Sequence, residues 1–344
     1  MSAVSVDLKS HFLATAVGSL PQDDPRQAVD FVFDVFASHV PFWPQLPRRS
    51  FLEQMVVQYS EKLPGLVLDV SGKRISIDTQ TDAYTQELEE TFNKCQAQDT
   101  AYFGVSRSHA EGLYFFAQRL KALSWKGWAK AQVIGPLSLG LSLLDEKKNP
   151  ILYNPELREL LPLFLARKAS WVARHVKAAE STKSIVFIDE PYLVSIGTAQ
   201  SGFSRQEFIE STNLMVEAIQ GQGALAGLHC CGNTDWEMVL ATGIDILSFD
   251  AYGYLDKFLL YPKALEIFLE RGGLLALGIV PNSQELLKKD LEQDLVTVLR
   301  RQPRLIKNGA LITPSCGCGS LSPDLSEKAH RLCVTLAQRL SQEF

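Results

Sequence analysis

Eight short runs of β-branched and aliphatic residues recur along the chain, and each is followed by a longer segment with helical periodicity. This alternation is typical of βαβ units, and near-continuous apolar runs such as Ile185–Ile188 favour strands that are covered on both faces. The eight predicted strands are Phe12–Ser19, Val40–Leu46, Trp128–Pro136, Ser184–Pro191, Gly223–Cys231, Ile246–Ala251, Leu274–Asn282 and Ala310–Cys318. Eight parallel strands with crossover helices predict an α/β fold, a TIM (β/α)8 barrel. A doubly wound open sheet is the alternative, but no glycine-rich phosphate loop follows the first strand.

An insertion of about residues 47–127 separates the second and third predicted strands. Within it, Leu66–Asp69 and Arg74–Ile77 flank the turn Val70-Ser71-Gly72-Lys73, a pattern that predicts a β-hairpin. Helices are predicted for Arg49–Lys62, Ala83–Lys94, Tyr153–Ser181 and Leu325–Gln342. No linker or repeat divides the chain, so residues 1–344 are predicted to form a single barrel domain.

Composition narrows the possible roles. The net charge is −5, with 34 basic and 39 acidic residues, so neither nucleic acid nor an anionic membrane surface is a predicted partner. The longest apolar runs, such as Leu274–Val280, are far shorter than the ~20 residues that span a bilayer. The first ten residues lack the apolar segment of a signal peptide. Six cysteines are too sparse for a disulfide scaffold, and they indicate a reduced, cytoplasmic setting.

Polar residues are concentrated where the predicted strands end, which is the edge that carries catalytic groups in this architecture. These ends read Gly18-Ser19, Gln45, Gly135-Pro136, Asp189-Glu190, His229-Cys230-Cys231, Asp250, Asn282 and Cys316-Gly317-Cys318. Four of the eight ends carry good metal ligands, and three of those four follow one another along the chain. This concentration predicts a metal site.

His229 and Cys231 are two positions apart, so their side chains leave a strand on the same face. Asp250 ends the next strand, and Cys316 or Cys318 follows the last. One imidazole and two thiolates suit zinc better than magnesium or calcium, which prefer oxygen ligands. The alternative is that these cysteines are small core residues. The remaining cysteines are expected to be structural, Cys230 because it faces the opposite way, and Cys95 and Cys333 because they fall on predicted helices.

A thiol-rich zinc site can activate water or bind a substrate thiol. Hydrolases prefer His and carboxylate ligands. Two cysteinate ligands weaken the Lewis acidity of the metal toward water, whereas a bound thiol loses its proton and stays nucleophilic. This ligand set therefore favours alkyl transfer to sulfur.

Three further segments are candidates for substrate or cofactor contacts. Asp189 and Glu190 can hold an amino group, bind a cation or serve as acid and base, or they can have a structural role at a helix N-terminus. Ser19 can hydrogen-bond a substrate carboxylate, or it can belong to a simple turn. The aromatic residues of Pro41–Pro47 could form a wall for a planar cofactor or pack in the core.

These motifs occur in one order that resembles a known family. Val17–Gln22, Gly135-Pro136, Ile188–Pro191, His229-x-Cys231 and Thr313–Gly317 follow one another as in the catalytic, C-terminal barrel of cobalamin-independent methionine synthase, within the wider uroporphyrinogen decarboxylase-like superfamily. The resemblance extends over about residues 12–340, apart from the insertion. It implies a short, single-barrel form with zinc at the barrel mouth that activates homocysteine for methylation to methionine.

Carried over residue by residue, the resemblance implies that His229, Cys231 and Cys316 are zinc ligands. Cys316 is preferred to Cys318 because the Pro-x-Cys-Gly context surrounds it. The fourth ligand of the family, a Glu, falls on Asp250, whose carboxylate is on a shorter side chain. The resemblance implies that Ser19 and Asp189 match positions that hold the amino-acid substrate, and Glu190 lies beside Asp189.

One departure from the family bears on the methyl donor. The family carries a His after the seventh strand that protonates the folate leaving group, but here that loop reads Gly278–Ser283 and has no His. A methyl group on cobalamin leaves without a proton, so methylcobalamin, carried by a separate corrinoid protein, is the expected donor in preference to methyltetrahydrofolate.

Several alternatives remain from the sequence. The acceptor could be another small thiol such as coenzyme M, because corrinoid-dependent methyltransferases of the superfamily use a similar His-x-Cys and Cys set. The chain could instead be a non-catalytic corrinoid- or metal-binding partner. Uroporphyrinogen decarboxylase itself relies on Arg and Asp near the first strand, and Arg26 is the only Arg close by. That activity is therefore disfavoured.

Overall fold

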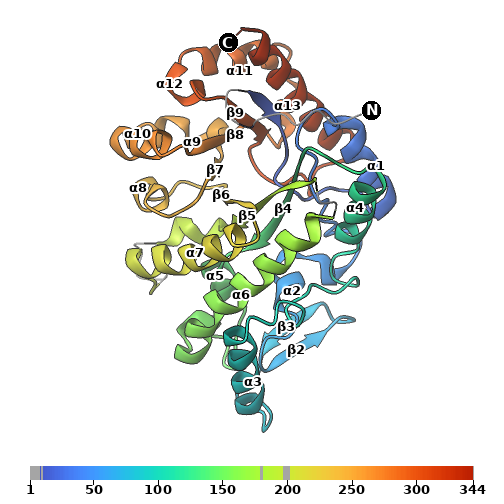
Figure 1. Cartoon of the computed structure of the whole chain (residues 1–344), viewed down its shortest axis with the longest axis vertical. Helices are drawn as coiled ribbons and strands as arrows, with labels where there is room; N and C mark the ends of the chain where they lie inside the picture. The colour runs from blue at the N-terminus through green and yellow to red at the C-terminus, as the bar shows by residue number, and fades with distance from the viewer. Residues whose placement is uncertain (1–7, 9–10, 179–180, 197–201, 344) are drawn as a thin grey trace.

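A computed structural model describes residues 8, 11–178, 181–196 and 202–343. Seven strands in this part of the chain form one parallel sheet in the order β1-β9-β8-β7-β6-β5-β4. The sheet curls, and helices cover its outer face (Figure 1). The strands are β1 (Phe12–Ala14), β4 (Trp128–Ile134), β5 (Lys183–Asp189), β6 (Leu225–Cys230), β7 (Ile246–Phe249), β8 (Leu274–Val280) and β9 (Ala310–Pro314). The predicted α/β TIM-type barrel is confirmed.

Residues 40–46 occupy the gap between the two edges of this sheet. The Gln45 amide donates to the Gly18 carbonyl beyond β1 at 3.0 Å, and the Trp43 amide donates to the Lys130 carbonyl of β4 at 2.8 Å. These parallel contacts connect the two edge strands of the sheet, β1 and β4, and close the barrel.

The predicted strand Val40–Leu46 is therefore present only as isolated bridges. Pro41 and Pro44 lack the N–H groups that a continuous ladder requires, so the pairing is interrupted. Two other predicted strands, Phe12–Ser19 and Ala310–Cys318, are regular only as far as Ala14 and Pro314. The other five predicted strands match to within two residues at each end.

Helices form the outer layer. They are α1 (Pro25–Phe36), α4 (Glu111–Ala122), α5 (Pro136–Ser142), α6 (Pro155–Val176), α7 (Arg205–Gln220), α8 (Trp236–Leu240), α9 (Ala251–Phe258), α10 (Pro262–Glu270), α11 (Leu291–Arg300), α12 (Pro303–Ile306) and α13 (Pro323–Glu343), with short 3₁₀ turns η2 (Ile151–Tyr153), η3 (Pro191–Ser195) and η4 (Gln284–Leu287). The helix predicted for Tyr153–Ser181 is α6; residues 179–180 lie outside the described part. The helix predicted for Leu325–Gln342 is α13. No helix among the described residues is both long and apolar enough to cross a membrane.

Residues 47–127 hold several elements, most of which gather at one end of the molecule (Figure 1). They are η1 (Phe51–Glu53), α2 (Met55–Ser60), β2 (Leu66–Asp69), β3 (Arg74–Ile77), α3 (Tyr84–Gln96) and α4. The antiparallel hairpin of β2 and β3 has the predicted bounds, and α3 corresponds to the helix predicted for Ala83–Lys94. The helix predicted for Arg49–Lys62 is divided into η1 and α2 because Gln54 is extended. Helix α4 contacts α1 and α6 in the outer layer.

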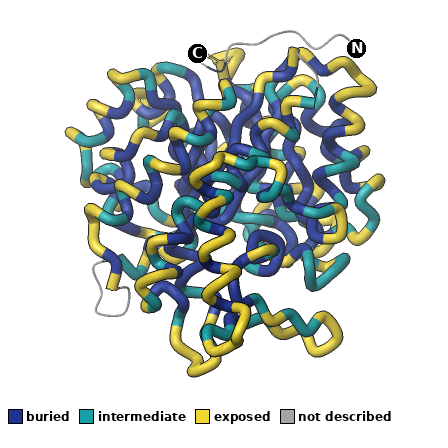
Figure 2. The backbone as a smooth tube through the Cα atoms, turned by 60° about the horizontal axis from the view of Figure 1, so that its bottom comes forward, coloured by how far each residue is buried: buried dark blue, intermediate teal, exposed yellow. Residues whose placement is uncertain are grey.

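The core has two parts, separated by the sheet. A small cluster inside the barrel contains Phe187, Ile246 and Leu311, whereas a much larger cluster lies between the sheet and the helices. Buried backbone accordingly fills the centre of the molecule and exposed turns surround it (Figure 2). The apolar residues inside the barrel stop short of the last residue of each strand, so the strand ends are left to form a polar site.

Candidate metal centre

Neighbouring strands bring the first group of polar side chains together. In the register of the sheet, His229 on β6 pairs with Asp189 on β5 and with Ser248 on β7. Because paired residues of a parallel sheet point to the same face, all three side chains face the barrel interior. Cys231 follows two residues after His229 and therefore continues the same face.

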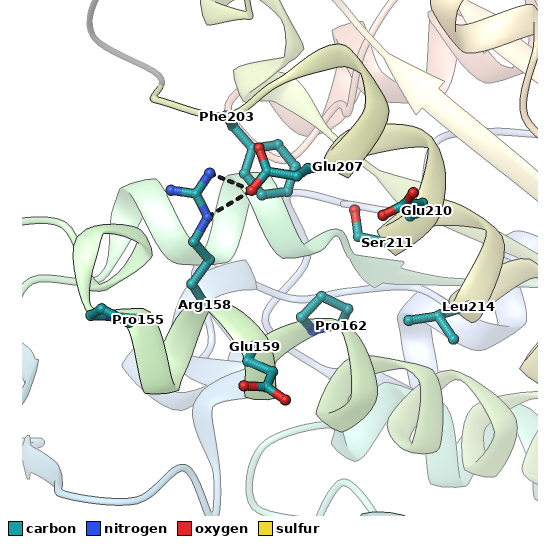
Figure 3. A pocket seen from close by; sticks show the side chains of 9 residues that line it. All are labelled: Pro155, Arg158, Glu159, Pro162, Phe203, Glu207, Glu210, Ser211 and Leu214. Atoms are coloured by element: carbon teal, nitrogen blue, oxygen red, sulfur yellow. Dashed lines mark hydrogen bonds and ion pairs between the residues drawn. The ribbon is translucent and has the colours of Figure 1, made fainter.

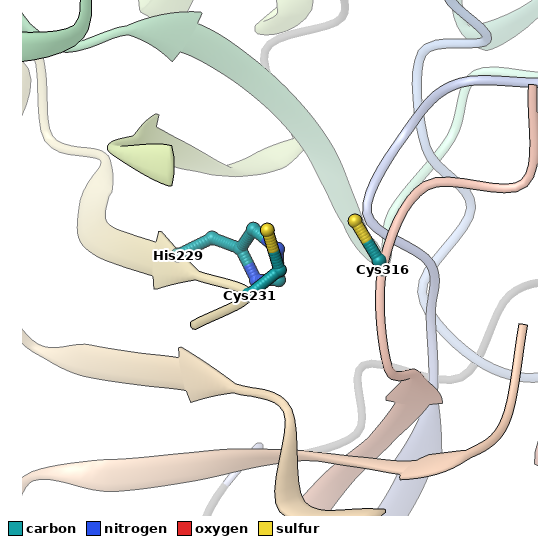
Figure 4. Close-up of side chains that lie close together, drawn as sticks. All are labelled: His229, Cys231 and Cys316. Carbon is teal, nitrogen blue, oxygen red and sulfur yellow. The ribbon is translucent and has the colours of Figure 1, made fainter. Parts of the chain in front are cut away.

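His229, Cys231 and Cys316 meet at the carboxyl ends of the strands. One potential ligand atom from each lies within 4.8 Å of the others. Cys316 comes from the segment after β9, and its sulfur points toward His229 and Cys231 from the opposite side (Figure 4). The structure thus brings together the three predicted ligands, and it leaves Cys318 outside the cluster.

The imidazole of His229 is oriented for ligation through one nitrogen. Its Nδ1 lies 2.9 Å from the Ser248 hydroxyl, while its Nε2 is buried and has no hydrogen-bond partner among the described residues. A ligating histidine commonly has its second ring nitrogen held by a hydrogen bond in this way. With two thiols beside the orphaned Nε2, the donor set fits a zinc ion.

The two cysteines of the cluster titrate as a pair. A hydrogen bond from Cys316 and the neighbouring His229 lower the pKa of Cys231 to about 4. The same contact raises the pKa of Cys316, because Cys316 is the member that keeps the proton. A thiolate is therefore available at neutral pH, and a thiolate is the form that binds metal.

The segment that carries Cys316 is held by two other strand ends. Asn282, which follows β8, accepts a hydrogen bond from the Ser315 hydroxyl at 3.1 Å and donates to the Gly317 carbonyl at 3.4 Å. The hydroxyl of Ser19, which follows β1, accepts from the Gly319 amide at 3.2 Å. Ser19 therefore has a structural contact in addition to its predicted role in substrate binding.

Asp250 lies outside the cluster of three. Its carboxylate accepts a hydrogen bond from the Gly253 amide at 2.7 Å and caps helix α9. Burial raises its pKa, and the charges of Cys231 and His229 also act on it. Asp250 is thus beside the centre, but one of its oxygens already has a partner. Its ligation stays a prediction.

Asp189 is buried in the barrel interior beside His229. Its Oδ1 has no hydrogen-bond partner among the described residues. Burial raises its pKa to about 6, although His229 and Lys130 act in the opposite direction. A buried carboxylate oxygen without a donor is costly, and a ligand that carries an ammonium group would satisfy it.

Glu190 points the other way and is already bound. Its carboxylate accepts hydrogen bonds from the Leu137 amide at 3.1 Å and from the Ser138 amide and hydroxyl at 2.8 and 2.5 Å. These groups form the N-terminus of α5. Burial raises its pKa to about 7. The side chain thus occupies a helix N-terminus, the structural alternative that the sequence left open.

Sequence reasoning missed Lys130 and Gln132, which point into the barrel from β4. Lys130 is only 3% exposed, and its Nζ donates to the Val17 carbonyl at 2.6 Å and to Gln132 Oε1 at 3.0 Å. The available signal was a pair of polar residues, two positions apart, within an otherwise apolar predicted strand.

The aromatic run at 41–47 does not form an exposed wall. Phe42 and Trp43 are fully buried, and Phe42 stacks on His330 of α13 at 5.8 Å between ring centroids. They pack in the core, the alternative stated for this run.

A shallow pocket of about 350 Å³ lies between α6 and α7 on the outside of the barrel (Figure 3). Arg158 forms an ion pair with Glu207 across it at 2.6 Å, and Phe203 lies beside them. None of its lining residues belongs to the metal cluster. It is a feature separate from the candidate centre.

Comparison of the sequence with protein-family profiles and with curated proteins finds no match. Two of the solved structures that match align with almost the whole chain. One is a methyltransferase from Methanosarcina mazei, with a TM-score of 0.56, 12% identity, and coverage of 97% of this chain and 95% of that chain. The other, from Listeria monocytogenes and described there as a proposed vitamin-B12-independent methionine synthase, has a TM-score of 0.52, 14% identity, and coverage of 99% of both chains. The fold is shared. At these identities the likeness concerns the architecture, so function has to be argued from the site.

Proposed function

We propose that this protein is a zinc-dependent methyltransferase that methylates the sulfur of a small thiol, with homocysteine as the acceptor and methionine as the product. The observation that carries the proposal is the cluster of His229, Cys231 and Cys316, whose donor atoms lie within 4.8 Å of one another. Structural likeness to a methyltransferase and to a proposed methionine synthase supports the same class of reaction.

The donor set determines which chemistry is favoured. When bound, zinc would keep one open position for an incoming sulfur and stabilise its thiolate form at neutral pH. The Ser248 hydroxyl fixes the orientation of the His229 ring. Contacts of Asn282 and Ser19 with the loop that carries Cys316 fix the position of that cysteine. Two thiolate ligands reduce the tendency to activate water, which disfavours hydrolysis.

Asp189 is the proposed contact for the amino-acid part of the acceptor. Its unpartnered Oδ1 faces the barrel interior beside His229, so an ammonium group bound there lies next to the metal cluster. Ser19, whose hydroxyl contacts the Gly319 amide in the Cys316 loop, is the proposed partner of the substrate carboxylate. This arrangement would hold the sulfur in line with the incoming methyl group.

Methylcobalamin on a corrinoid protein is the proposed methyl donor. At the end of β8 the structure has Asn282, which is bound to Ser315 and Gly317 and cannot act as a general acid. Among the described histidines, only His229 belongs to the cluster. Transfer from cobalamin needs no acid, because cobalt keeps the electron pair of the broken bond as sulfur forms the new one.

The deciding experiment follows methylcobalamin demethylation by its colour change with zinc-loaded protein and a panel of thiols. We expect turnover with homocysteine, loss of turnover after chelation of the metal, and no turnover in Cys316→Ser. Faster turnover with coenzyme M would identify the alternative acceptor. Methylation of homocysteine from methyltetrahydrofolate without a corrinoid would overturn the choice of donor. Bound zinc with no transfer to any thiol would favour the non-catalytic alternative.

A further inference from the structure

The described part of the chain has two buried lysines, and only Lys130 lies on the barrel sheet. Its Nζ donates to the Val17 carbonyl at 2.6 Å and to Gln132 Oε1 at 3.0 Å. An ammonium group has three N–H donors, so these two hydrogen bonds leave one N–H without an oxygen acceptor among the described residues. The ammonium also lies over the Phe187 ring, 5.0 Å from its centroid, a contact that does not supply the third acceptor. A buried cation with an uncommitted donor is a candidate for binding an anionic ligand group.

The Lys130 ammonium lies against the segment that follows β1. Val17 precedes Gly18 and Ser19, the residues that follow β1. Gly18 has a φ of 144°, and the Gln132 side chain occupies the space that a Cβ there would need, at 2.4 Å. Lys130 and Gln132 therefore form the support on which the Gly18-Ser19 turn rests. The charge of Lys130 is next to the turn already proposed to receive a carboxylate.

Asp189 provides the complementary charge. The two groups are close enough for each charge to affect the other's pKa. Among the described residues, however, no ion pair within 4.0 Å joins Lys130 to Asp189, and Asp189 Oδ1 has no hydrogen-bond partner. Two buried opposite charges that do not pair directly are costly, unless a ligand with both charges satisfies them.

We propose that Lys130 is a specificity-determining residue, which supplies the positive charge for the carboxylate of an amino-acid thiol while Asp189 receives its ammonium group. This inference rests on the proposed function and narrows its acceptor to thiols with both charged groups. A thiol that carries only one of them leaves either Lys130 or Asp189 unsatisfied.

The protonation state of Lys130 is consistent with this role. Burial lowers its pKa to about 8, and the charge of Asp189 opposes that shift. Lys130 is therefore largely protonated at neutral pH. The alternative is that Lys130 is purely structural and only supports the Val17 carbonyl. In that case, changing the side chain should weaken the binding of every thiol by the same factor.

The experiment compares three thiols of matched length by calorimetric binding to zinc-loaded protein. Homocysteine has both charged groups, 4-mercaptobutyrate has only the carboxylate, and 3-aminopropanethiol has only the amine. We expect wild type to bind homocysteine most tightly. In Lys130→Met, homocysteine and 4-mercaptobutyrate should bind about 10- to 100-fold more weakly, which is the usual effect of losing a hydrogen bond to a charged group, whereas 3-aminopropanethiol should be unaffected.

Three further variants separate the possible outcomes. Asp189→Asn should show the opposite pattern: homocysteine and 3-aminopropanethiol, which both carry an amine, should bind more weakly, and 4-mercaptobutyrate should bind as it does to wild type. Lys130→Arg should keep the preference for carboxylates. Lys168→Met, a change of the other buried lysine on the outer helix α6, is the matched control and should bind all three thiols like wild type.

Two results would overturn the inference alone: equal loss for all three thiols in Lys130→Met, or wild-type binding of 3-aminopropanethiol as tight as that of homocysteine. Absence of zinc-dependent binding of any thiol to wild type would instead overturn the proposed function on which the inference rests. Zinc content and melting temperature, measured for each variant, show whether a loss of binding comes from loss of the fold.

Discussion

Single residues at the strand ends have different amounts of unused bonding capacity. Among the described residues, His229 has one nitrogen held by Ser248 and one without a hydrogen-bond partner, and Asp189 has an oxygen without one. Glu190, by contrast, is fully engaged at the N-terminus of α5. Unused capacity, and not residue type alone, distinguishes the groups that are available to a ligand from those that support the fold.

The two cysteines after β9 provide a matched pair of variants. Cys316 belongs to the metal cluster, whereas Cys318 is buried and its burial raises its pKa to about 12. We expect Cys316→Ser to lose most of the bound zinc, because a hydroxyl is a poor replacement for a thiolate ligand. Cys318→Ser should keep it. Metal analysis of the two purified variants tests this, and equal zinc content would contradict the assignment.

Lys168 predicts a pH-dependent stability effect away from the site. Its Nζ is buried on α6 without a hydrogen-bond partner among the described residues, and burial lowers its pKa to about 7. The unfolded chain has the ordinary, higher lysine pKa. Above about pH 7, unfolding is therefore accompanied by uptake of a proton. The buried lysine destabilises the folded state most at or below pH 7, and progressively less as pH rises toward 10.

Replacing this lysine removes that cost. We expect Lys168→Met to raise the melting temperature by a few degrees at pH 7 and by less at pH 9.5. Thermal unfolding of variant and wild type at both pH values is the measurement. An equal or larger gain at the higher pH would show that the amine is not neutralised by burial.

At the scale of elements, the apolar periodicity located most strands, because residues of a parallel sheet are buried on both faces. The segment 40–46 was the exception. Its composition predicts a strand, but its two prolines prevent a continuous ladder, and the partner groups that it does bind are far away in the sequence. The positions of His229, Cys231 and Cys316 could be predicted as strand ends. The support from Lys130, Gln132 and Asn282 could not, because it depends on which strands become neighbours.

Helix α9 begins beside the metal cluster, and the residue that caps it, Asp250, is also the candidate fourth ligand. Asp250 accepts from the Gly253 amide, so Asp250→Ala should lose a helix cap worth about 1 kcal/mol. It should weaken zinc binding less than Cys316→Ser, because Asp250 lies outside the cluster of three. Asp250→Asn, which can still cap, separates the two effects when zinc affinity and unfolding are both measured. Complete loss of zinc in both variants would instead identify Asp250 as a required ligand.

At the scale of the whole molecule, the cluster joins segments that are distant along the chain. Because the three donors meet only in the folded barrel, a bound ion stabilises the folded state over the unfolded one. We therefore expect zinc to raise the melting temperature of wild type, and a chelator to reverse the rise. The Cys316→Ser variant should show little response to either, and a response equal to that of wild type would mean that the ion binds elsewhere.

The position of Cys316 after β9, the last strand of the barrel, has a consequence for how the protein is made. While the chain is being synthesised, His229 and Cys231 emerge first and offer an ion only two of the three clustered donors. The third arrives when the final strand is added between β8 and β1. A nascent chain that has not yet reached Cys316 therefore lacks one of the three donors, and the full cluster can bind metal only after β9 and Cys316 have been made.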